Sequence, residues 1–179
     1  MCPSAAEPFG VNLKLRNQAH SQMTATPLNR LVLRDATFDD WRLLYRWRND
    51  IRVRTASRNP EPIDEQTHRD WLTSCLQDSQ RRLLIAELNG NPVGTIRVDF
   101  GPVCELSWTV APEARGKGIG GRMVCDVVKT IQSPMKAVTR NDNFASQRIA
   151  VAAGFELVYN EGEWMTFQRG PGFSETSND

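Results

Sequence analysis

The chain has 179 residues and a net charge of +1, so one domain around one buried core is favoured, and no global charge points to nucleic acid. It contains no run of about 18 apolar residues and no basic start leading into a hydrophobic stretch, so neither a membrane-spanning helix nor a secretory signal is expected. The four cysteines and two histidines show no metal-ligand spacing, which argues against a metal site or a disulfide framework and favours a cytoplasmic protein.

Composition divides the chain into three segments. Residues 1–29 are polar, contain prolines and lack clear periodicity, so a flexible N-terminal extension is expected there. One folded domain is expected over residues 30–170. Residues 171–179 are expected to form a disordered tail.

The first part of the domain predicts one strand and two helices. The strand is expected over residues 31–34. Thr37 and Asp40 have the spacing of a capping box, which opens a helix that runs to Arg48. A break rich in proline follows, and a second helix is predicted over residues 64–77.

Three antiparallel strands are predicted next. Residues 83–88 and 93–100 flank the segment Asn89-Gly90-Asn91-Pro92, which is a hairpin signal. Residues 104–110 alternate apolar and polar side chains without interruption, as a strand with one polar face does.

The most informative segment is residues 109–121, TVAPEARGKGIGG, where four glycines and two cations separate this strand from a predicted helix over residues 119–131. A glycine-rich turn that opens a helix leaves backbone N–H groups free, and the helix dipole favours an anion there. Arg115 and Lys117 add positive charge at the same place. The segment therefore predicts a site for a diphosphate.

The remaining elements complete an α+β pattern. A strand is predicted over residues 135–139, a helix over residues 143–152, and a final pair of strands over residues 155–159 and 164–168. Strands first, then alternating helices and strands, indicate a mixed sheet flanked by helices.

Two motifs in this order resemble those of the GCN5-related N-acetyltransferase (GNAT) superfamily. Arg115, Gly118 and Gly120 fill the pattern Arg-x-x-Gly-x-Gly, and Asn143-Phe-Ala-Ser146 leads through one helix to Gly154-Phe155. The resemblance covers about residues 31–169. It implies a mixed, mostly antiparallel sheet and an enzyme that transfers acetyl from acetyl-CoA directly to a primary amine.

The resemblance also implies which residues bind acetyl-CoA. Backbone groups of the strand before the glycine turn would hold the pantetheine and the acetyl carbonyl, the turn would hold the pyrophosphate, and the second motif would face the cofactor. The expected cofactor-binding residues are Trp108, Thr109, Val110, Arg115, Gly116, Lys117, Gly118, Ile119, Gly120, Asn143 and Ser146.

Three residues are candidates for proton transfer. Glu105 lies on the polar face of a central strand, where a carboxylate would accept the amine proton or attract an ammonium group. Members of the superfamily often use a tyrosine as general acid at the position that Ala150 occupies here. Ser146 and Tyr159 are the alternatives, beside water.

The acceptor is predicted from the segment that begins at Trp47-Arg48-Asn49-Asp50. Arg52, Arg54, Arg58 and His68 are candidates for substrate binding, because a guanidinium cluster can clamp a nucleotide diphosphate. This segment resembles acetyltransferases of nucleotide-linked amino sugars, such as those of the pseudaminic acid pathway.

Two alternatives stay open. The same segment is similar to ribosomal-protein N-terminal acetyltransferases, which accept a peptide amine, and a CoA-binding module without catalysis would explain Ala150. A small-molecule amine as partner and a homodimer are expected, with no nucleic acid, membrane or metal.

Overall fold

The computed structural model describes residues 30–170. The expected extension over residues 1–29 and the expected tail over residues 171–179 lie outside the described residues. In chain order the elements are β1 (Leu31–Asp35), α1 (Trp41–Asn49), α2 (Ile51–Thr55), α3 (Glu65–Gln77), β2 (Arg81–Leu88), β3 (Asn91–Asp99), β4 (Cys104–Val110), α4 (Ile119–Val128), β5 (Met135–Arg140), α5 (Phe144–Ala152), β6 (Glu156–Glu161) and β7 (Trp164–Arg169).

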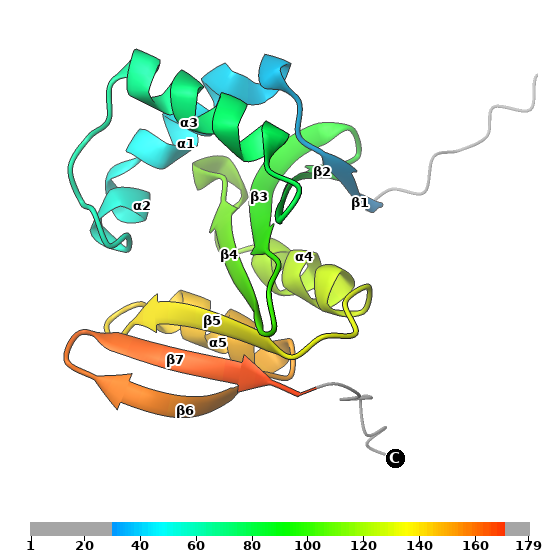
Figure 1. The fold of residues 1–179 in the computed structure, drawn as a ribbon, viewed down its shortest axis with the longest axis vertical. Coiled ribbons are helices and arrows are strands. Elements are labelled where there is room, and N and C mark those ends of the chain that lie inside the picture. Colours follow the sequence, from blue (N-terminus) through cyan, green and yellow to red (C-terminus); the bar gives the residue numbers. More distant parts are fainter. Residues whose placement is uncertain (1–29, 171–179) are drawn as a thin grey trace, which may run out of the picture.

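The strands form one sheet in the order β1-β2-β3-β4-β5-β7-β6 (Figure 1). Neighbours in it are antiparallel, except that β4 and β5 are parallel. This parallel pair joins only Cys104–Leu106 to Met135–Ala137, and beyond it β4 and β5 do not pair with each other. The predicted fold class, a mixed and mostly antiparallel sheet flanked by helices, is confirmed.

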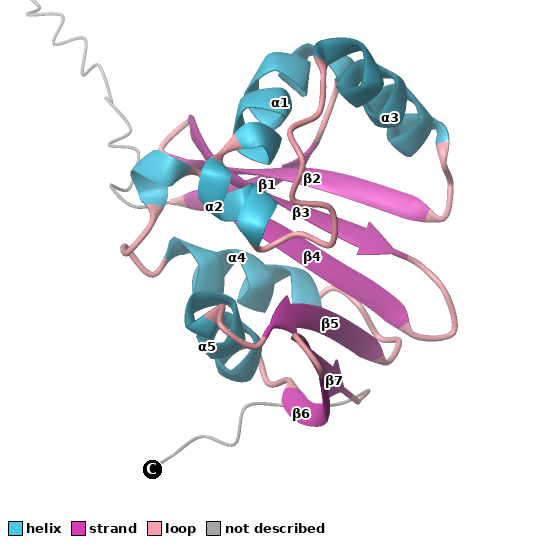
Figure 2. Cartoon of the chain, turned by 90° about the vertical axis from the view of Figure 1, so that its left-hand side faces the viewer, coloured by secondary structure: helices cyan, strands magenta, loops and turns pink. Residues whose placement is uncertain are grey.

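The helices pack in two groups (Figures 1 and 2). Helices α1, α2 and α3 lie together, with α3 against β2, whereas α4 packs on β3 and β4 and contacts α5. The core includes Ile85 and Ile96 from the sheet and Met123 and Val124 from α4, and all four side chains are fully buried. The two groups flank the part of β4 that does not pair with β5.

Local signals in the sequence formed as predicted at two places. Asp40 Oδ2 accepts a hydrogen bond from Thr37 N at 2.8 Å, which completes the capping box before α1. Asn89 and Gly90 have φ values of 53° and 79°, as a two-residue hairpin turn between twisted strands requires. The hairpin is therefore tighter than the four residues expected, and β3 begins at Asn91.

Two helices differ from the predictions. Helix α4 ends at Val128 and not at residue 131, because Thr130 Oγ1 donates to the carbonyl oxygen of Val127 at 2.8 Å and Thr130 N donates to the same oxygen. Helix α2 was not predicted. It is five residues long and begins where Asp50 Oδ1 accepts from Val53 N at 3.3 Å.

Candidate active site

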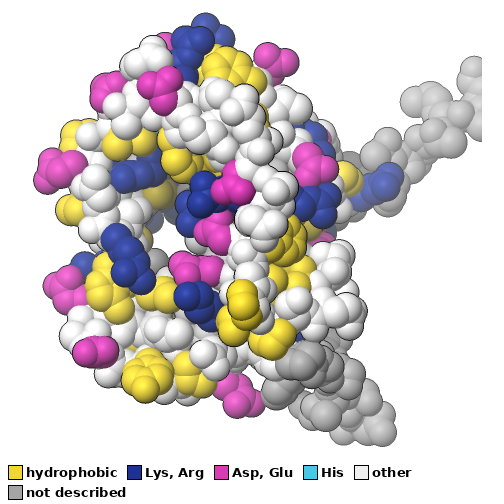
Figure 3. Space-filling model, viewed as in Figure 1, with side chains coloured by type: hydrophobic (Ala, Val, Ile, Leu, Met, Phe, Trp, Pro, Cys, Tyr) yellow, Lys and Arg dark blue, Asp and Glu magenta, His cyan; other side chains and the backbone are white. Residues whose placement is uncertain are grey.

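A large cleft opens between the two groups of helices. It encloses about 1260 Å³, more than the roughly 300–1,000 Å³ of most small-molecule pockets. Its walls come from α1, α2 and α3, from β3, β4 and the start of α4, and from β5, α5 and β7. Figure 3 shows the surface hollowed between the upper and lower parts of the molecule, with basic side chains beside the hollow. The cleft is large enough for two ligands at once.

One edge of β4 faces this cleft with its backbone. Cys104 N donates to Pro134 O on the β5 side, and alternate residues of a strand direct their N–H groups to the same side. The N–H groups of Trp108 and Val110 therefore point to that side, where the parallel pairing ends at Leu106. Free backbone donors in a cleft suit the amides and carbonyls of an extended ligand.

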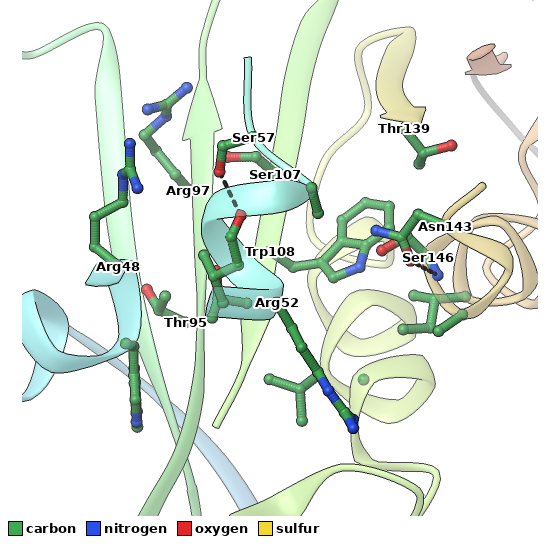
Figure 4. Close-up of a pocket in the computed structure, with 18 of the residues that line it drawn as sticks. Arg48, Arg52, Ser57, Thr95, Arg97, Ser107, Trp108, Thr139, Asn143 and Ser146 are labelled. Carbon is green, nitrogen blue, oxygen red and sulfur yellow. Dashed lines mark hydrogen bonds between the residues drawn. The ribbon is translucent and has the colours of Figure 1, made fainter. Parts of the chain in front are cut away.

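Two buried side-chain atoms beside this edge have no hydrogen-bond partner among the described residues. They are Trp108 Nε1 and Thr139 Oγ1, and both residues line the cleft (Figure 4). A buried polar atom left unpaired costs about 1–3 kcal/mol. A bound molecule with polar groups would relieve this cost.

The backbone of the glycine turn has a geometry that suits the diphosphate site expected from the sequence. Gly116 and Gly118 have φ values of 76° and 71°, and a side chain at either position would meet no atom within 4 Å. Gly118 begins the ten-residue helix α4 and no side chain caps it. The N–H groups of Ile119, Gly120 and Gly121 are therefore free for an anion at the cleft wall.

Gly120 also has a role in packing. A Cβ atom there would lie 2.5 Å from Ile149 Cδ1 and 3.0 Å from Val110 Cγ2. The absence of a side chain lets α4 approach α5 and β4 closely. Gly120 lines the cleft, but its lack of a Cβ is explained by packing.

The two cations of the turn are engaged with the protein. Arg115 Nη2 lies 2.6 Å from Asp50 Oδ1, and Arg115 Nε donates to Val110 O at 3.3 Å. This guanidinium holds the pKa of Asp50 below its usual value. Lys117 Nζ donates to Glu113 O at 2.8 Å and Lys117 is not among the cleft-lining residues. Arg115 thus ties the end of β4 to the start of α2.

The second motif also reaches the cleft. Asn143 and Ser146 both line it, and Asn143 Oδ1 accepts from Ser146 N at 3.2 Å, which caps α5. Ala150 is completely buried and lies outside the lining, so α5 places no general acid there.

Glu105 lies in the cleft with Ser107 and Thr109, the polar face that the alternation predicted. Its Oε2 is 2.9 Å from Lys136 Nζ on β5, a contact that the sequence did not indicate. The parallel register pairs Glu105 directly with Lys136. The carboxylate is therefore held in place by a cation at its side.

The structure does not bring Tyr159 to the site. Tyr159 lies on the edge strand β6 with 69% of its surface exposed, and it does not line the cleft. All six residues of β6 are exposed. Its assignment as a proton donor is therefore withdrawn, and Ser146 is the remaining candidate of the two.

The predicted substrate residues divide in the same way. Arg52, Arg58 and His68 line the cleft, whereas Arg54 does not and donates from Nη1 to Pro60 O at 3.3 Å. The prediction that Arg54 binds substrate is therefore not supported by its position. The Arg58 guanidinium lies 5.4 Å from the ring centre of Trp164 on β7, so it links the two sides of the cleft.

His68 is buried, with 1% of its surface exposed. Its ring lies 5.6 Å from that of Tyr45 and 5.3 Å from that of Trp71, measured between centres. Burial, and then the nearby charge of Arg48, lower the pKa of His68. The imidazole is therefore neutral at neutral pH.

Sequence reasoning left several cleft residues without a role. They are Arg48, Thr95, Arg97, Ser107, Thr139, Arg148 and Trp164, seven of those that line the cleft. Figure 4 shows most of them and also shows Arg52 pointing away from Arg48 and Arg97. Alternation along β3 could have predicted that Thr95 and Arg97 share one face of the sheet. No local sequence pattern could have predicted that this face meets α1.

Residues 30–170 hold no group of His, Cys, Asp and Glu that could bind a metal ion. No helix in the same range is long and apolar enough to cross a membrane.

Solved structures share the fold of this chain. The ribosomal-protein-alanine N-acetyltransferase of Brucella melitensis is 24% identical, with a TM-score of 0.66, over 77% of this chain and 98% of that one. A GNAT phosphinothricin acetyltransferase of Sinorhizobium meliloti, solved with AcCoA, is 24% identical, with a TM-score of 0.66, over 79% and 89%. Spermidine N-acetyltransferase of Vibrio cholerae, solved with CoA and spermine, is 14% identical, with a TM-score of 0.66, over 77% and 92%.

The sequence itself identifies the family. No curated protein gives a significant match. The family model for the acetyltransferase (GNAT) domain matches residues 30–156, which include the glycine turn and the second motif. The chain therefore belongs to the GNAT family of N-acetyltransferases.

Proposed function

We propose that this N-acetyltransferase binds acetyl-CoA along β4 and α4 and transfers the acetyl group to the primary amine of an anionic small molecule, specifically a nucleotide-linked amino sugar. The observation that carries the acceptor assignment is the charge of the cleft. Three arginines beside α1 to α3, namely Arg48, Arg52 and Arg58, line it without a carboxylate partner among the described residues.

The residues present fit acetyl-CoA. The free N–H groups at the start of α4 suit its pyrophosphate. The open edge of β4, with Trp108 and Val110, suits the amides of its pantetheine, and Thr139 Oγ1 and Trp108 Nε1 supply further polar atoms. Arg148 on α5 also lines the cleft and adds a positive charge that suits a phosphate.

Acetyl-CoA, when bound, supplies an activated thioester that an amine can attack. The protein would contribute position and proton transfer. Glu105 would hold the acceptor ammonium and take its proton, directly or through water. Backbone donors of β4 would stabilise negative charge that develops on the acetyl oxygen. Ser146 or water would return a proton to the thiolate, whose pKa of about 8.5 makes it a tolerable leaving group.

The charge of the cleft separates classes of acceptor. A polyamine or another polycation would meet arginines of the same sign of charge. A diphosphate would instead form charge-assisted hydrogen bonds with guanidinium groups. The anionic acceptor is therefore favoured over the cationic one. A peptide amine, the second candidate from the sequence, gains no specific support from the cleft.

The test is CoA release from acetyl-CoA with matched acceptors. A uridine-diphosphate-linked amino sugar, the free amino sugar, spermidine and a short N-terminal peptide would be compared at equal concentration. We expect the highest kcat/KM for the nucleotide sugar. Faster turnover of spermidine or of the peptide would overturn the acceptor assignment, and binding of acetyl-CoA without turnover of any amine would indicate a non-catalytic module.

A further inference from the structure

Arg48 and His68 both line the cleft on its α1–α3 side, and neither has a carboxylate partner among the described residues. Arg48 Nη2 donates to Asn59 O at 2.9 Å, while Arg48 Nη1 is buried and has no partner among residues 30–170. Burial and the nearby charge of Arg54 both lower the pKa of Arg48. A guanidinium that is partly buried beside a second one, with no carboxylate in contact, is an arrangement that an anion stabilises.

His68 provides a second observation at the same place. It is 1% exposed, it lines the cleft, and its Nδ1 has no hydrogen-bond partner among the described residues. Arg48 lies close enough for its charge to act on the imidazole. Tyr45 packs edge-on against the ring and Trp71 packs at a tilt, and neither gives Nδ1 a hydrogen bond.

The acidic groups of the neighbouring elements are engaged elsewhere. Asp50 pairs with Arg115 at 2.6 Å, and Glu105 pairs with Lys136 at 2.9 Å. On β3, Asp99 pairs with Arg97 at 2.9 Å and also with Arg81. None of these carboxylates is left to neutralise Arg48.

We propose that the Arg48–His68 pair binds an oxyanion of the acceptor, so that the acceptor is an amine carrying a phosphate or carboxylate group. Arg48 Nη2 is held by the backbone oxygen of Asn59, and the unpartnered Nη1 is left to donate to the anion. His68 adds one further hydrogen bond. The inference rests on the proposed function only in assigning the anion to the acceptor.

The experiment follows anion binding without requiring turnover. The protein is saturated with CoA, which fills the start of α4, and is titrated with inorganic phosphate or with acetate. The imidazole and amide signals of His68 are followed by NMR. We expect them to shift and saturate. Phosphate as the stronger probe would assign a phosphorylated acceptor, and acetate as the stronger probe a carboxylate.

Matched variants locate the site. Arg48→Gln should weaken the binding roughly 10- to 100-fold, the effect of one or more charge-assisted hydrogen bonds, and Arg48→Lys should weaken it less. Arg46→Gln is the control, because Arg46 lies on the same helix with 64% of its side chain exposed. It should bind like the parent protein. If Arg48→Gln fails to fold, Arg48→Lys carries the comparison.

The outcomes separate the two proposals. No shift of His68 with either anion, or equal affinity in the Arg48 variants and the parent, would overturn this inference while leaving acetyl transfer untouched. Anion binding at His68 in a protein that acetylates none of the acceptors would overturn the proposed function and keep the anion site.

Discussion

Glu105 and Lys136 face each other across the parallel pair of strands, with Oε2 and Nζ 2.9 Å apart. Glu105 is the only carboxylate among the described residues that line the cleft. Its cationic neighbour is about one third exposed, so water also reaches the pair. Lys136 is thereby a positioning residue for the candidate base.

Replacing Glu105 by Gln should lower kcat/KM by roughly 10²- to 10⁴-fold, the usual contribution of a general base. Lys136→Met should lower it by at most roughly fivefold, because a partly exposed ion pair contributes about 0.2–1 kcal/mol. Steady-state kinetics of both variants and of the double variant measure this. If Lys136 acts through Glu105, its replacement adds nothing in the Glu105→Gln background. Additive losses would contradict the positioning role.

Gly120→Ala should destabilise the protein by about 1–3 kcal/mol, because the new methyl group overlaps Ile149 in a packed contact between α4 and α5. Adding Ile149→Val, which removes the nearest atom, should restore part of this loss. Urea unfolding of the single and double variants measures it. Gly118→Ala is the matched control: it has open space, and its φ of 71° gives only the cost of a left-handed residue. Equal losses without rescue would contradict the packing role.

Asp50→Asn should cost about 1.5–3 kcal/mol at neutral pH, because it removes the charged partner of Arg115 while asparagine still caps α2. The folded-state pKa of Asp50 is lowered, first by the Arg115 hydrogen bond. This stabilisation is complete above the unfolded pKa of about 4 and is lost as the pH falls through the lower folded pKa.

The measurement is urea unfolding of parent and Asp50→Asn proteins across that pH range. Their free energies of unfolding should converge in acid. Glu113→Gln is the control, since Glu113 and its partner Arg46 are both mostly exposed and their charged atoms lie 3.6 Å apart. This substitution should change the free energy of unfolding by less than about 1 kcal/mol. A difference between parent and Asp50→Asn that persists undiminished in acid would contradict the ion-pair explanation.

His68 should make the fold sensitive to mild acid. Its pKa is lowered by burial and by Arg48, so the unfolded chain takes up the proton first, near its pKa of about 6.5. The stability due to the neutral imidazole is present above that pH and is lost as the pH falls towards the folded pKa. Unfolding free energies at about pH 7.5 and about pH 5.5 should fall more steeply in the parent than in His68→Gln. Parallel slopes would contradict the buried, neutral assignment.

The sequence carried the parts of the fold that depend on local patterns. Alternation in residues 104–110 located β4 and its polar face, and the glycines located the start of α4. Helix α2 was missed because five residues are fewer than two helical turns and leave no periodicity to detect. Tyr159 was misplaced for a tertiary reason: β6 ends up at the edge of the sheet, and no local pattern distinguishes an edge strand from an inner one.

The contacts within the site depend on register and could not be read from the chain. Lys136 meets Glu105 because of how β5 pairs with β4, and Arg58 meets Trp164 although 106 positions separate their numbers. Asp50 and Arg115 meet for the same reason. A motif defines which side chains are available, while strand pairing and helix packing decide which of them converge.

Strands β4 and β5 pair over a short length only, so few backbone hydrogen bonds join the two parts of the sheet at this point. Only three residue pairs of backbone join β5 to β4 there, while α4 contacts α5 and Arg58 lies over the ring of Trp164 on β7. A ligand bound between β4 and β5 would contact both strands and bridge them where they do not pair with each other. The bound substrate would therefore also stabilise the fold. The protein would unfold at a higher temperature with the ligand bound than without it.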